Sequence, residues 1–370
     1  MRIVHVVQSL GMGGQERLIL DYSRELARRG HEPIIATMSP GGALRPEFDP
    51  IPVVDIPKSD GFDPLAIGRI AKKLSELSPD VIHTHNPPPL LYVVPAARLL
   101  RQRRIVHTKH GRNIYGRNSL RLAQVNARLV SAFVAVSEVT REQALMIEHP
   151  PSERLHVIRN GIPLSKFGPD AATKVRVRQE LGIPLNAFVI GSVGRLAAEK
   201  DYPFLITSVR ERLGKDVHLV LVGEGPERGT IESKIDPKLK PFVHLLGLRA
   251  DVPDLLRAFD LFVLSSKTEG LPLVLPEAMA TGLPILSTSV GGIPDVIRPE
   301  YGSLVAHGDA ASFGKELDTF LADRDRTVEM GARAREEALR SYSVETMADK
   351  YLRLYSEDGP RLLSWRPQAR

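Results

Sequence analysis

Short apolar runs alternate with longer amphipathic stretches from the first residues of the chain. Residues 2–10 are apolar almost throughout and predict a buried strand, and residues 11–14 are glycine-rich and predict a turn. Apolar positions then recur at helical spacing over residues 16–30, and residues 33–38 predict a second strand. Three further strands are predicted in this half: residues 81–84, 105–108 and 132–136. Strands that alternate with helices imply a parallel sheet with right-handed crossovers.

The same pattern restarts after Gly161-Ile-Pro163. The strands predicted there are residues 188–193, 217–222, 243–246, 261–264 and 284–288. Most of these runs lead into a glycine-bearing loop, as expected where a strand hands over to a helix. The chain is therefore predicted to be an α/β protein of two doubly wound domains, joined near residues 162–175. A ligand is then expected in a cleft between two sets of strand ends.

The composition fits this interpretation and excludes several kinds of chemistry. The 370 residues suffice for two domains, and 42% hydrophobic with 25% charged residues is typical of a soluble globular protein. The absence of cysteine excludes disulfides, thiolate zinc sites and a cysteine nucleophile. The start, Met1 to Val7, is interpreted as a first strand and not a signal peptide, and no run approaches the ~18 apolar residues that span a bilayer. We therefore expect a cytoplasmic protein.

The net charge of +6 belongs to the N-terminal half. Residues 1–165 contain 22 Lys and Arg against 15 Asp and Glu, whereas residues 166–370 contain 28 against 29. Residues 81–137 contain no acidic residue at all. The basic residues of this acid-free stretch are Arg98, Arg101, Arg103, Arg104, Lys109, Arg112, Arg117, Arg121 and Arg128. Such a surface attracts an anionic membrane, a pyrophosphate-linked lipid or a nucleic acid, and the alternative is a solvated face without a partner.

Two carboxylates lie close together in the sequence after the predicted strand 261–264. Glu269 and Glu277 are eight positions apart, with a glycine, two prolines and an apolar run between them. Gly270 leaves the backbone bare, so that its N–H and that of Leu271 can approach a phosphate. Fixed carboxylates beside exposed N–H groups suit a polyhydroxyl ligand that also carries phosphate.

Two cations follow the predicted strand 188–193. Arg195 comes directly after Gly194, and Lys200 lies five residues further on. A guanidinium and an ammonium on one loop that enters a helix can hold a diphosphate from two sides. The alternative is a pair of surface cations near Glu199.

A glycine-rich turn opens the first helix. The amides of Gly13 and Gly14, with the helix dipole, can hold an anion. A dinucleotide site is the rival interpretation, but the spacing is not Gly-x-Gly-x-x-Gly and the second strand does not end in an acidic residue.

Two histidines and the string Asp323-Arg-Asp325 are candidate metal ligands. His83 and His85 alternate on a predicted strand and so share a face, but no nearby Asp, Glu or Cys obviously completes a site. Asp323-Arg-Asp325 lies in a charged helical stretch without a preceding strand, which indicates solvated side chains. No metal is therefore expected. His110 differs from these, because it ends a predicted strand before a glycine and can project into the cleft.

Several of these strings together resemble retaining glycosyltransferase family 4. The resemblance rests on Glu269-Gly-Leu-Pro followed by Glu277-Ala-Met-Ala-Thr-Gly-Leu-Pro-Ile, on Gly194-Arg-Leu…Glu-Lys and on Thr108-Lys-His-Gly, and it runs from about residue 3 to residue 355. It implies the GT-B fold, in which two Rossmann-like domains face each other across a cleft. Residues 1–165 would bind the acceptor, joined by a returning C-terminal helix at about 344–370, and residues 166–343 would bind the nucleotide-sugar.

The resemblance also implies roles for the residues nearest the reaction. Arg195 and Lys200, with Gly194, would bind the donor diphosphate, and Glu269, with the amides of Gly270 and Leu271, would orient sugar hydroxyls and phosphate. His110 would lie beside the transferred sugar.

Other parts of the donor site are implied in the same way. Gly223 and Leu248 lie in strings that resemble the two loops holding the nucleoside, and Glu277 would accept hydrogen bonds from the ribose hydroxyls. The loop of Gly13 and Gly14 would lie against the donor phosphates and the acceptor.

The implied activity is retaining transfer of a sugar from a nucleoside-diphosphate sugar to an acceptor hydroxyl, with UDP-sugar favoured over GDP-mannose. No residue is an obvious covalent nucleophile, which favours front-face attack. No metal or other cofactor is expected, because Arg195, Lys200 and helix N-termini would stabilise the leaving diphosphate. The acceptor is expected to be a lipid-linked or polysaccharide-precursor glycan, with the basic region 98–128 against the inner face of the cell membrane. A nucleotide-sugar 2-epimerase of the same fold is the alternative, and a nucleic-acid-binding protein is disfavoured because it leaves Glu269 and Glu277 unexplained.

Overall fold

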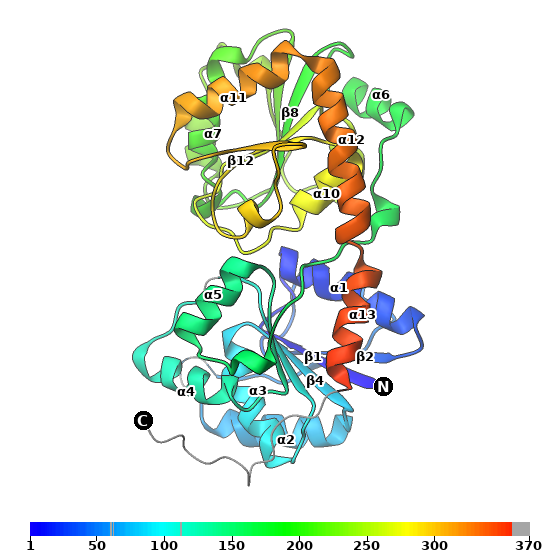
Figure 1. Cartoon of the computed structure of the whole chain (residues 1–370), viewed down its shortest axis with the longest axis vertical. Coiled ribbons are helices and arrows are strands. Elements are labelled where there is room, and N and C mark those ends of the chain that lie inside the picture. Colours follow the sequence, from blue (N-terminus) through cyan, green and yellow to red (C-terminus); the bar gives the residue numbers. More distant parts are fainter. Residues whose placement is uncertain (60, 62, 112, 357–370) are drawn as a thin grey trace. The chain divides into compact units, whose positions relative to one another are not determined.

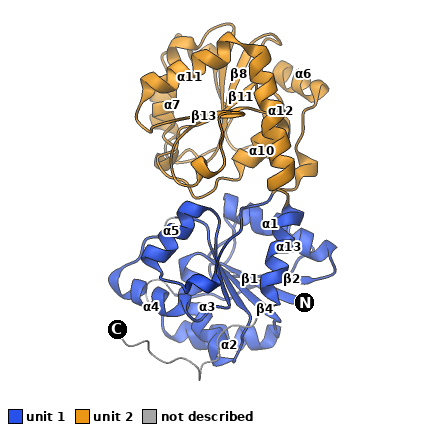
Figure 2. Ribbon diagram, in the orientation of Figure 1, with its two compact units in different colours: residues 1–161, 344–370 blue, residues 162–343 orange. Residues whose placement is uncertain are grey.

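The chain forms two compact α/β units, seen in a computed structural model that describes residues 1–59, 61, 63–111 and 113–356 (Figure 1). Unit 1 comprises residues 1–161 and the segment from residue 344 onward, and unit 2 comprises residues 162–343 (Figure 2). Each unit contains one parallel sheet with helices on both faces, so the predicted fold class is confirmed. Residues 357–370 of the expected C-terminal segment lie outside the described residues.

The sheet of unit 1 has seven parallel strands in the order β3-β2-β1-β4-β5-β6-β7. The strands are β1 (Arg2–Val7), β2 (Glu32–Thr37), β3 (Val53–Asp55), β4 (Val81–His85), β5 (Ile105–Lys109), β6 (Ala132–Ala135) and β7 (Leu155–Val157). The strand order reverses between β1 and β4, which is where doubly wound sheets place their ligands. The loops after β1, β4 and β5 carry Gly13, Asn86 and His110 respectively.

Helices cover both faces of this sheet (Figure 1). They are α1 (Gly14–Arg28), α2 (Leu65–Leu77), α3 (Pro87–Leu99), α4 (Arg117–Ala127), α5 (Glu138–Ile147) and α13 (Val344–Tyr355). An apolar core joins α2, α3 and α4 to one face. On the other face, α1 packs with the returning helix α13. The apolar stripe of α1 explains its position, because Leu18, Ile19, Tyr22 and Leu26 are all buried.

A polar layer lies between α13 and the strands of unit 1. The hydroxyl of Tyr22 donates to that of Tyr355 at 2.9 Å, and Tyr355 is also 2.7 Å from Nδ1 of His83. The Thr108 hydroxyl is 3.0 Å from that of Tyr351. Because buried polar groups need partners, these hydrogen bonds make α13 an integral part of unit 1.

The sheet of unit 2 has six parallel strands in the order β10-β9-β8-β11-β12-β13. The strands are β8 (Phe188–Val193), β9 (Val217–Val222), β10 (Val243–Leu245), β11 (Leu261–Leu264), β12 (Ile285–Thr288) and β13 (Gly302–Val305). The helices are α6 (Ala171–Glu180), α7 (Tyr202–Val209), α8 (Arg228–Ser233), α9 (Val252–Arg257), α10 (Val274–Thr281), α11 (Ala310–Ala322) and α12 (Arg324–Ser341). An apolar core joins α7, α8 and α11 to one face of this sheet.

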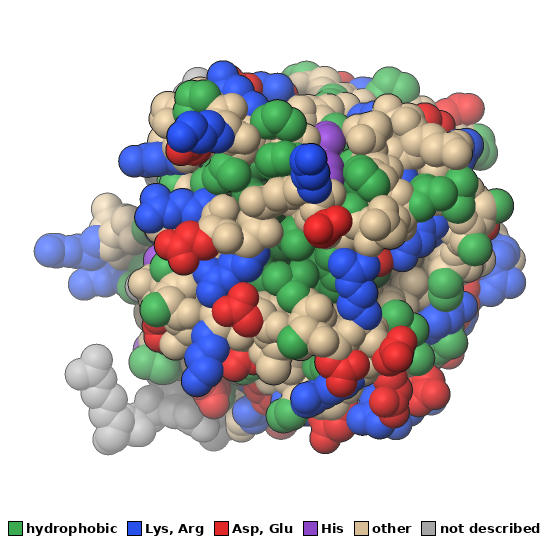
Figure 3. Space-filling model, turned by 90° about the horizontal axis from the view of Figure 1, so that it is seen from above, with side chains coloured by type: hydrophobic (Ala, Val, Ile, Leu, Met, Phe, Trp, Pro, Cys, Tyr) green, Lys and Arg blue, Asp and Glu red, His purple; other side chains and the backbone are tan. Residues whose placement is uncertain are grey.

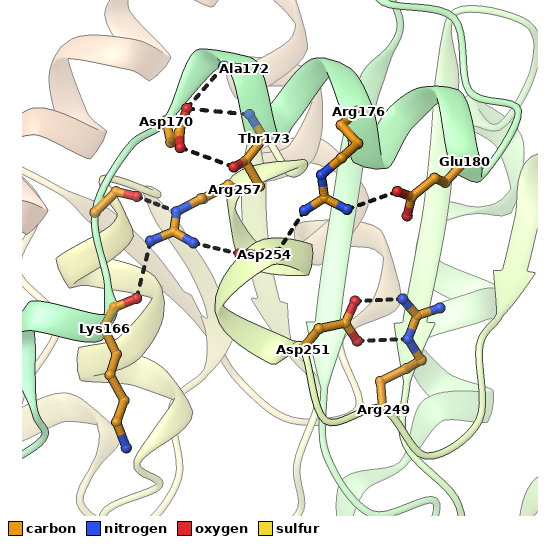
Figure 4. Close-up of polar contacts among 11 residues, drawn as sticks. Lys166, Asp170, Ala172, Thr173, Arg176, Glu180, Arg249, Asp251, Asp254 and Arg257 are labelled. Atoms are coloured by element: carbon orange, nitrogen blue, oxygen red, sulfur yellow. Dashed lines mark hydrogen bonds and ion pairs between the residues drawn. The ribbon is translucent and has the colours of Figure 1, made fainter.

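Charge is balanced over residues 166–370, and Figure 3 shows one face of the molecule on which basic and acidic side chains are interspersed. Many of these charges have structural partners. Arg257 donates to the carbonyls of Gly168 at 2.8 Å and Lys166 at 3.1 Å and to Asp254 at 2.6 Å, which fastens the first residues of unit 2 to α9 (Figure 4). The carboxylate of Asp323 accepts from the backbone N–H of Arg326 at 2.9 Å, so this aspartate caps α12.

Two residues of the predicted basic surface are buried, which corrects the expectation from the sequence. Arg98 is only 5% exposed, and its guanidinium donates to the carbonyls of Gln102 and Leu129. Lys109 has no exposed surface and forms an ion pair with the equally buried Glu148, Nζ to Oε1 2.6 Å. The sequence window missed this partner because Glu148 lies outside the acid-free stretch. Arg112 lies outside the described residues.

The Lys109–Glu148 pair also holds the loop after β5. The same Oε1 of Glu148 accepts from the Tyr115 hydroxyl at 2.9 Å and from Nδ2 of Asn113 at 3.2 Å. Burial, and then the neighbouring Glu148 carboxylate, raise the pKa of the Tyr115 hydroxyl, which keeps it a donor. This loop begins with His110, so the ion pair helps to position a predicted site residue.

We predict that Lys109→Met lowers the free energy of unfolding by about 3–5 kcal/mol, because it leaves the Glu148 carboxylate buried without a counter-charge. Urea unfolding measures the change. The double variant Lys109→Met/Glu148→Gln is expected to recover much of the loss, because the amide oxygen still accepts from Tyr115.

An exposed ion pair supplies the control for this prediction. Arg333 pairs with Glu329 at 2.5 Å with both side chains at least half exposed, so Arg333→Met is expected to cost less than about 1 kcal/mol. A loss for Lys109→Met as small as that of the control would contradict the structural role of the buried pair.

Candidate functional site

In unit 2, a lysine and a glutamate from two neighbouring strand ends meet in an ion pair. Lys200 ends the short helix Ala198–Lys200 that follows β8, and Glu269 lies in the loop after β11. The Lys200 Nζ is 2.5 Å from Oε1 of Glu269, and the two side chains are 16% and 11% exposed. The Ser266 hydroxyl donates to the same oxygen at 2.6 Å. The Glu269 carboxylate is therefore held in one orientation at the carboxyl edge of the sheet.

Backbone contacts fix the loop that carries Glu269. Gly291, in the loop after β12, has φ +54°, and a Cβ at this position would lie 1.8 Å from the carbonyl oxygen of Glu269. Beside it, the N–H of Gly292 donates to the carbonyl of Gly270 at 2.9 Å. Only glycine permits this approach, so the loop after β12 supports the loop after β11 directly. Leu271 is buried beneath the same loop.

The loops after β8, β9 and β10 also pack by backbone contacts. Gly223 has φ +142°, and a Cβ at this residue would lie 2.0 Å from the carbonyl oxygen of Gly194. The N–H of Gly223 donates to the carbonyl of Gly247 at 2.9 Å. The next residue, Leu248, is 62% exposed. Gly194, Gly223 and Leu248 are thus brought to one edge of the sheet.

The two residues predicted to bind the diphosphate differ in their side-chain contacts. Arg195 is exposed, and its guanidinium makes no hydrogen bond or ion pair with any residue that the structure describes. Lys200 is instead committed to Glu269. An incoming diphosphate would find the guanidinium available, whereas it would share the ammonium with the carboxylate.

Glu277 lies in the first turn of α10, where a carboxylate interacts favourably with the helix dipole. The helix starts at Val274, so Pro276 also lies in its first turn. A proline in the first turn is tolerated because the first N–H groups of a helix have no acceptor within it. Glu277 is half-buried, on the helix that directly follows the Glu269 loop.

In unit 1, one asparagine joins three loops at the carboxyl edge of the sheet. Asn86 has φ +61°, its Nδ2 donates to Oε1 of Gln15, and its Oδ1 accepts from the N–H of His110 at 3.0 Å. The loops after β1, β4 and β5 therefore meet at this residue. The sequence analysis does not predict a role for Gln15. The feature that could have indicated one is its position directly after a glycine turn at a strand end.

Gly13 and Gly14 of the predicted anion site are exposed, but a carboxylate from the same helix lies close to Gly13. Gly13 precedes α1 without a side-chain cap, and a Cβ at Gly13 would lie 2.3 Å from Oε2 of Glu16. Burial raises the pKa of the Glu16 carboxyl, and a hydrogen bond to backbone partly opposes this shift. A phosphate at this helix terminus would have to displace Glu16.

His110 is half-buried, and its Nε2 is 3.0 Å from Nδ1 of His85. Burial lowers the pKa of His110 to about 4, so the imidazole is neutral at physiological pH. It can then serve as a hydrogen-bond donor or acceptor but not as a cation.

Three other imidazoles gather behind His110. Ring nitrogens of His5, His83 and His85 lie within 4.8 Å of one another, a group that the sequence missed because only the pairing of β1 with β4 places His5 beside His83. Both nitrogens of His83 already have partners at 2.7 Å, the Tyr355 and Thr108 hydroxyls. A metal ion would have to displace one of these hydrogen bonds.

Comparison with known proteins gives consistent matches over both units. Residues 187–323 match the family described as Glycosyl transferases group 1, and residues 12–166 match the family described as Glycosyltransferase Family 4. The chain is 30% identical over 318 residues to the putative glycosyltransferase EpsF of Bacillus subtilis, covering 78% of this chain and 79% of that protein. It is 29% identical over 299 residues to the Escherichia coli UDP-Gal:alpha-D-GlcNAc-diphosphoundecaprenol alpha-1,3-galactosyltransferase, covering 77% of each.

Solved structures agree on the fold. The crystal structure of HepE from Anabaena in complex with UDP superposes with a TM-score of 0.86 at 24% identity, covering 96% of this chain and 100% of that chain. A glycosyltransferase from Rickettsia africae superposes with a TM-score of 0.84 at 21% identity, covering 96% and 97% respectively.

The backbone contact at Gly223 leads to a prediction about stability. Gly223→Ala is expected to lower the free energy of unfolding by about 1–3 kcal/mol or more, because φ is positive and the new Cβ meets the carbonyl of Gly194. Chemical denaturation measures this. In Gly229→Ala, the new Cβ on α8 meets no atom within 4 Å, so stability should stay the same or rise by up to about 1 kcal/mol. Equal effects of the two substitutions would show that the Gly223 contact is dispensable.

Proposed function

The chain belongs to the glycosyltransferases of group 1 and family 4, with their GT-B fold, and from this premise we propose a retaining, metal-independent transferase that uses a UDP-sugar. The acceptor that we propose is a hydroxyl of a lipid-linked or polysaccharide-precursor glycan. The observation that carries the proposal is the Lys200–Glu269 pair, with the available guanidinium of Arg195 on the segment after β8 that also carries Lys200, at strand ends where three loops pack through glycines.

These groups have complementary roles toward a nucleotide-sugar. Arg195 and Lys200, with Gly194, would bind the diphosphate. As phosphate draws the ammonium of Lys200 away, the Glu269 carboxylate is freed to accept hydrogen bonds from the sugar hydroxyls. Glu277, on the next helix, would accept from the ribose hydroxyls.

The remaining residues complete the proposed donor site. The loops that carry Gly223 and Leu248 would hold the nucleoside, and the amides of Gly270 and Leu271 would contact phosphate. Two hydrogen bonds between Arg249 and Asp251, at 2.7 and 2.5 Å, brace the loop after Leu248 (Figure 4). The Gly13–Gly14 turn would face the phosphates once Glu16 has moved.

The proposed reaction is front-face displacement. The bond between the anomeric carbon and the leaving phosphate breaks, and a bond to the acceptor oxygen forms on the same face of the sugar. The acceptor proton passes to the leaving phosphate oxygen. Arg195 and Lys200 would stabilise the charge that grows on the diphosphate, the task that a metal ion performs in other transferases. The neutral imidazole of His110 would hydrogen-bond to the sugar.

Support for uridine as the base comes from relatives. The Escherichia coli relative is named for transfer from UDP-Gal to a diphosphoundecaprenol acceptor, and the Anabaena structure contains UDP. The former name also supports a lipid-linked acceptor.

A nucleotide panel with one variant tests the donor site. We predict that UDP stabilises the protein against heat in EDTA as well as in Mg²⁺, by about 2.7 kcal/mol at a hundred times its dissociation constant. At the same concentration, GDP and ADP are expected to stabilise it less.

Arg195→Ala is expected to reduce turnover by roughly 10²–10³-fold, as loss of a donor to a developing anion does. The exposed Arg210 of the same unit provides the control variant Arg210→Ala, which should retain normal turnover. Stabilisation only in Mg²⁺, or normal turnover in Arg195→Ala, would refute the metal-independent site.

A face of α4 supports the proposed membrane contact. Arg117 and Arg121 on α4, and Arg128 directly after it, are exposed at helical spacing on one side, and Val125, half exposed, lies on the same side. Ile114, just before the helix, is 90% exposed. Basic and apolar side chains on one exposed face suit an anionic lipid surface. No helix among the described residues is long and apolar enough to cross a membrane.

Flotation with liposomes tests this face. We predict that the protein floats with phosphatidylglycerol-containing vesicles and not with phosphatidylcholine alone. Changing the three α4 arginines to glutamate should weaken binding by at least roughly a hundredfold, because each arginine near an anionic surface contributes about 1 kcal/mol. The control changes three exposed arginines of α12, Arg326, Arg333 and Arg340, to glutamate and should float normally. Equal binding to both kinds of vesicle would contradict the proposed contact with an anionic membrane.

A further inference from the structure

A line of hydrogen-bonded imidazoles runs from the interior of unit 1 to the edge of its sheet. Nδ1 of His5 is 3.2 Å from Nε2 of His85, and Nδ1 of His85 is 3.0 Å from Nε2 of His110. These three histidines come from β1, the end of β4 and the loop after β5. We call them the histidine line. His5 and His85 are buried, and His110 alone reaches the edge of the sheet.

Each ring of the histidine line carries a single N–H. Burial lowers the pKa of His5 to about 3 and that of His110 to about 4, and the pKa of His85 lies well below its ordinary value for the same reason. All three rings are therefore neutral at pH 7. A neutral imidazole has one donor nitrogen and one acceptor nitrogen. Each hydrogen bond in the line needs one donor nitrogen and one acceptor nitrogen. The hydrogen bonds can therefore run in only two directions along the line.

The buried end of the line distinguishes the two directions. Nε2 of His5 is buried and has no hydrogen-bond partner among the residues that the structure describes. If every ring carries its proton on Nδ1, this nitrogen is a bare acceptor. If every ring carries its proton on Nε2, it becomes a buried N–H without an acceptor. Unpaired buried N–H groups are rarer in proteins than incompletely satisfied acceptors, so the first direction is favoured.

We infer that His5 and His85 are positioning residues that hold His110 in the Nδ1–H tautomer, so that His110 offers a hydrogen-bond donor to an oxygen of the transferred sugar. The contact with sugar rests on the proposed function, whereas the tautomer rests on the histidine line alone. Nδ1 of His110 makes no hydrogen bond to any described residue, which leaves it available for a substrate. Free histidine in water prefers the Nε2–H tautomer, so three Nδ1–H rings in sequence would be a distinctive arrangement.

A separate hydrogen-bond network favours the other tautomer, Nε2–H, at His83. Tyr22 donates to Tyr355, so the proton of Tyr355 is available for Nδ1 of His83. Nε2 of His83 then carries the proton and donates to the Thr108 hydroxyl at 2.7 Å. His83 and His85 lie two residues apart on one strand, with ring centroids 4.1 Å apart, yet they are expected to be opposite tautomers. His83 thus provides an internal reference for the other tautomer.

Nitrogen NMR of the full chain tests the inference directly. In protein labelled with ¹⁵N-histidine at pH 7, two-bond ¹H–¹⁵N correlations distinguish Nδ1–H from Nε2–H rings, and single histidine variants assign the signals. We expect His5, His85 and His110 to be Nδ1–H. An Nε2–H ring at His85 or His110 would overturn the inference. This readout does not depend on donor binding, so a failure of the proposed function would appear separately, as the absence of stabilisation by UDP.

A variant of His85 tests the positioning role. His85→Leu removes the donor to Nε2 of His110, so the Nε2–H tautomer of His110 should become the major one. Transfer turnover is then expected to fall by about tenfold, the value of one hydrogen bond, while affinity for UDP is unchanged. His85→Asn, whose amide nitrogen can take the place of Nδ1, should keep both the tautomer and most of the turnover.

Another buried histidine controls for general effects of removing an imidazole. His107 on β5 contacts Thr84 and Phe133 and lies outside the histidine line. His107→Leu should leave the His110 tautomer unchanged. An Nδ1–H ring at His110 that persists in His85→Leu would refute the role of His85. If His85→Leu does not fold, the wild-type spectrum and His85→Asn still decide the question.

Discussion

The fold of unit 1 depends on the need of every buried polar group for a partner. Its central strands are covered on both faces, a setting in which parallel strands are normally apolar throughout. Here they carry imidazoles at His5, His83 and His85. Burial keeps these rings neutral, and hydrogen bonds with the Tyr355 and Thr108 hydroxyls satisfy the ring of His83. The position of helix α13 and the orientation of His110 both follow from this one requirement.

Unit 2 positions its functional groups by a different physical means. The polar groups of its proposed site, Lys200 and Glu269, lie in the loops beyond the strand ends. Backbone contacts that only glycine permits, at Gly223 and Gly291, hold these loops against one another. The loops then present Lys200 and Glu269 as a preformed ion pair. Side-chain hydrogen bonds thus orient the groups in unit 1. In unit 2, close backbone packing positions the loops, and Lys200 and the Ser266 hydroxyl then hold the Glu269 carboxylate.

The sequence was sufficient wherever the information was local. Strands β8, β9 and β11 match their predicted bounds, because each is a mainly apolar run that ends at a turn or loop signal. Contacts between distant residues were beyond reach. Lys109 was assigned to the surface because its partner Glu148 lies on another element, and His5 was overlooked because only strand register brings it to His83. The roles assigned to Arg195 and the other site residues came from motif resemblance, since spacing alone does not show which charges meet.

The return of the chain to unit 1 has a consequence for its synthesis. A ribosome completes residues 1–161 first and all of unit 2 next, and only then makes α13 (Val344–Tyr355). Until that moment the imidazole of His83 and the hydroxyl of Tyr22 lack the phenol of Tyr355 that satisfies them. The half of the protein that is translated first therefore cannot reach its final structure until the last helix of the other segment has been made.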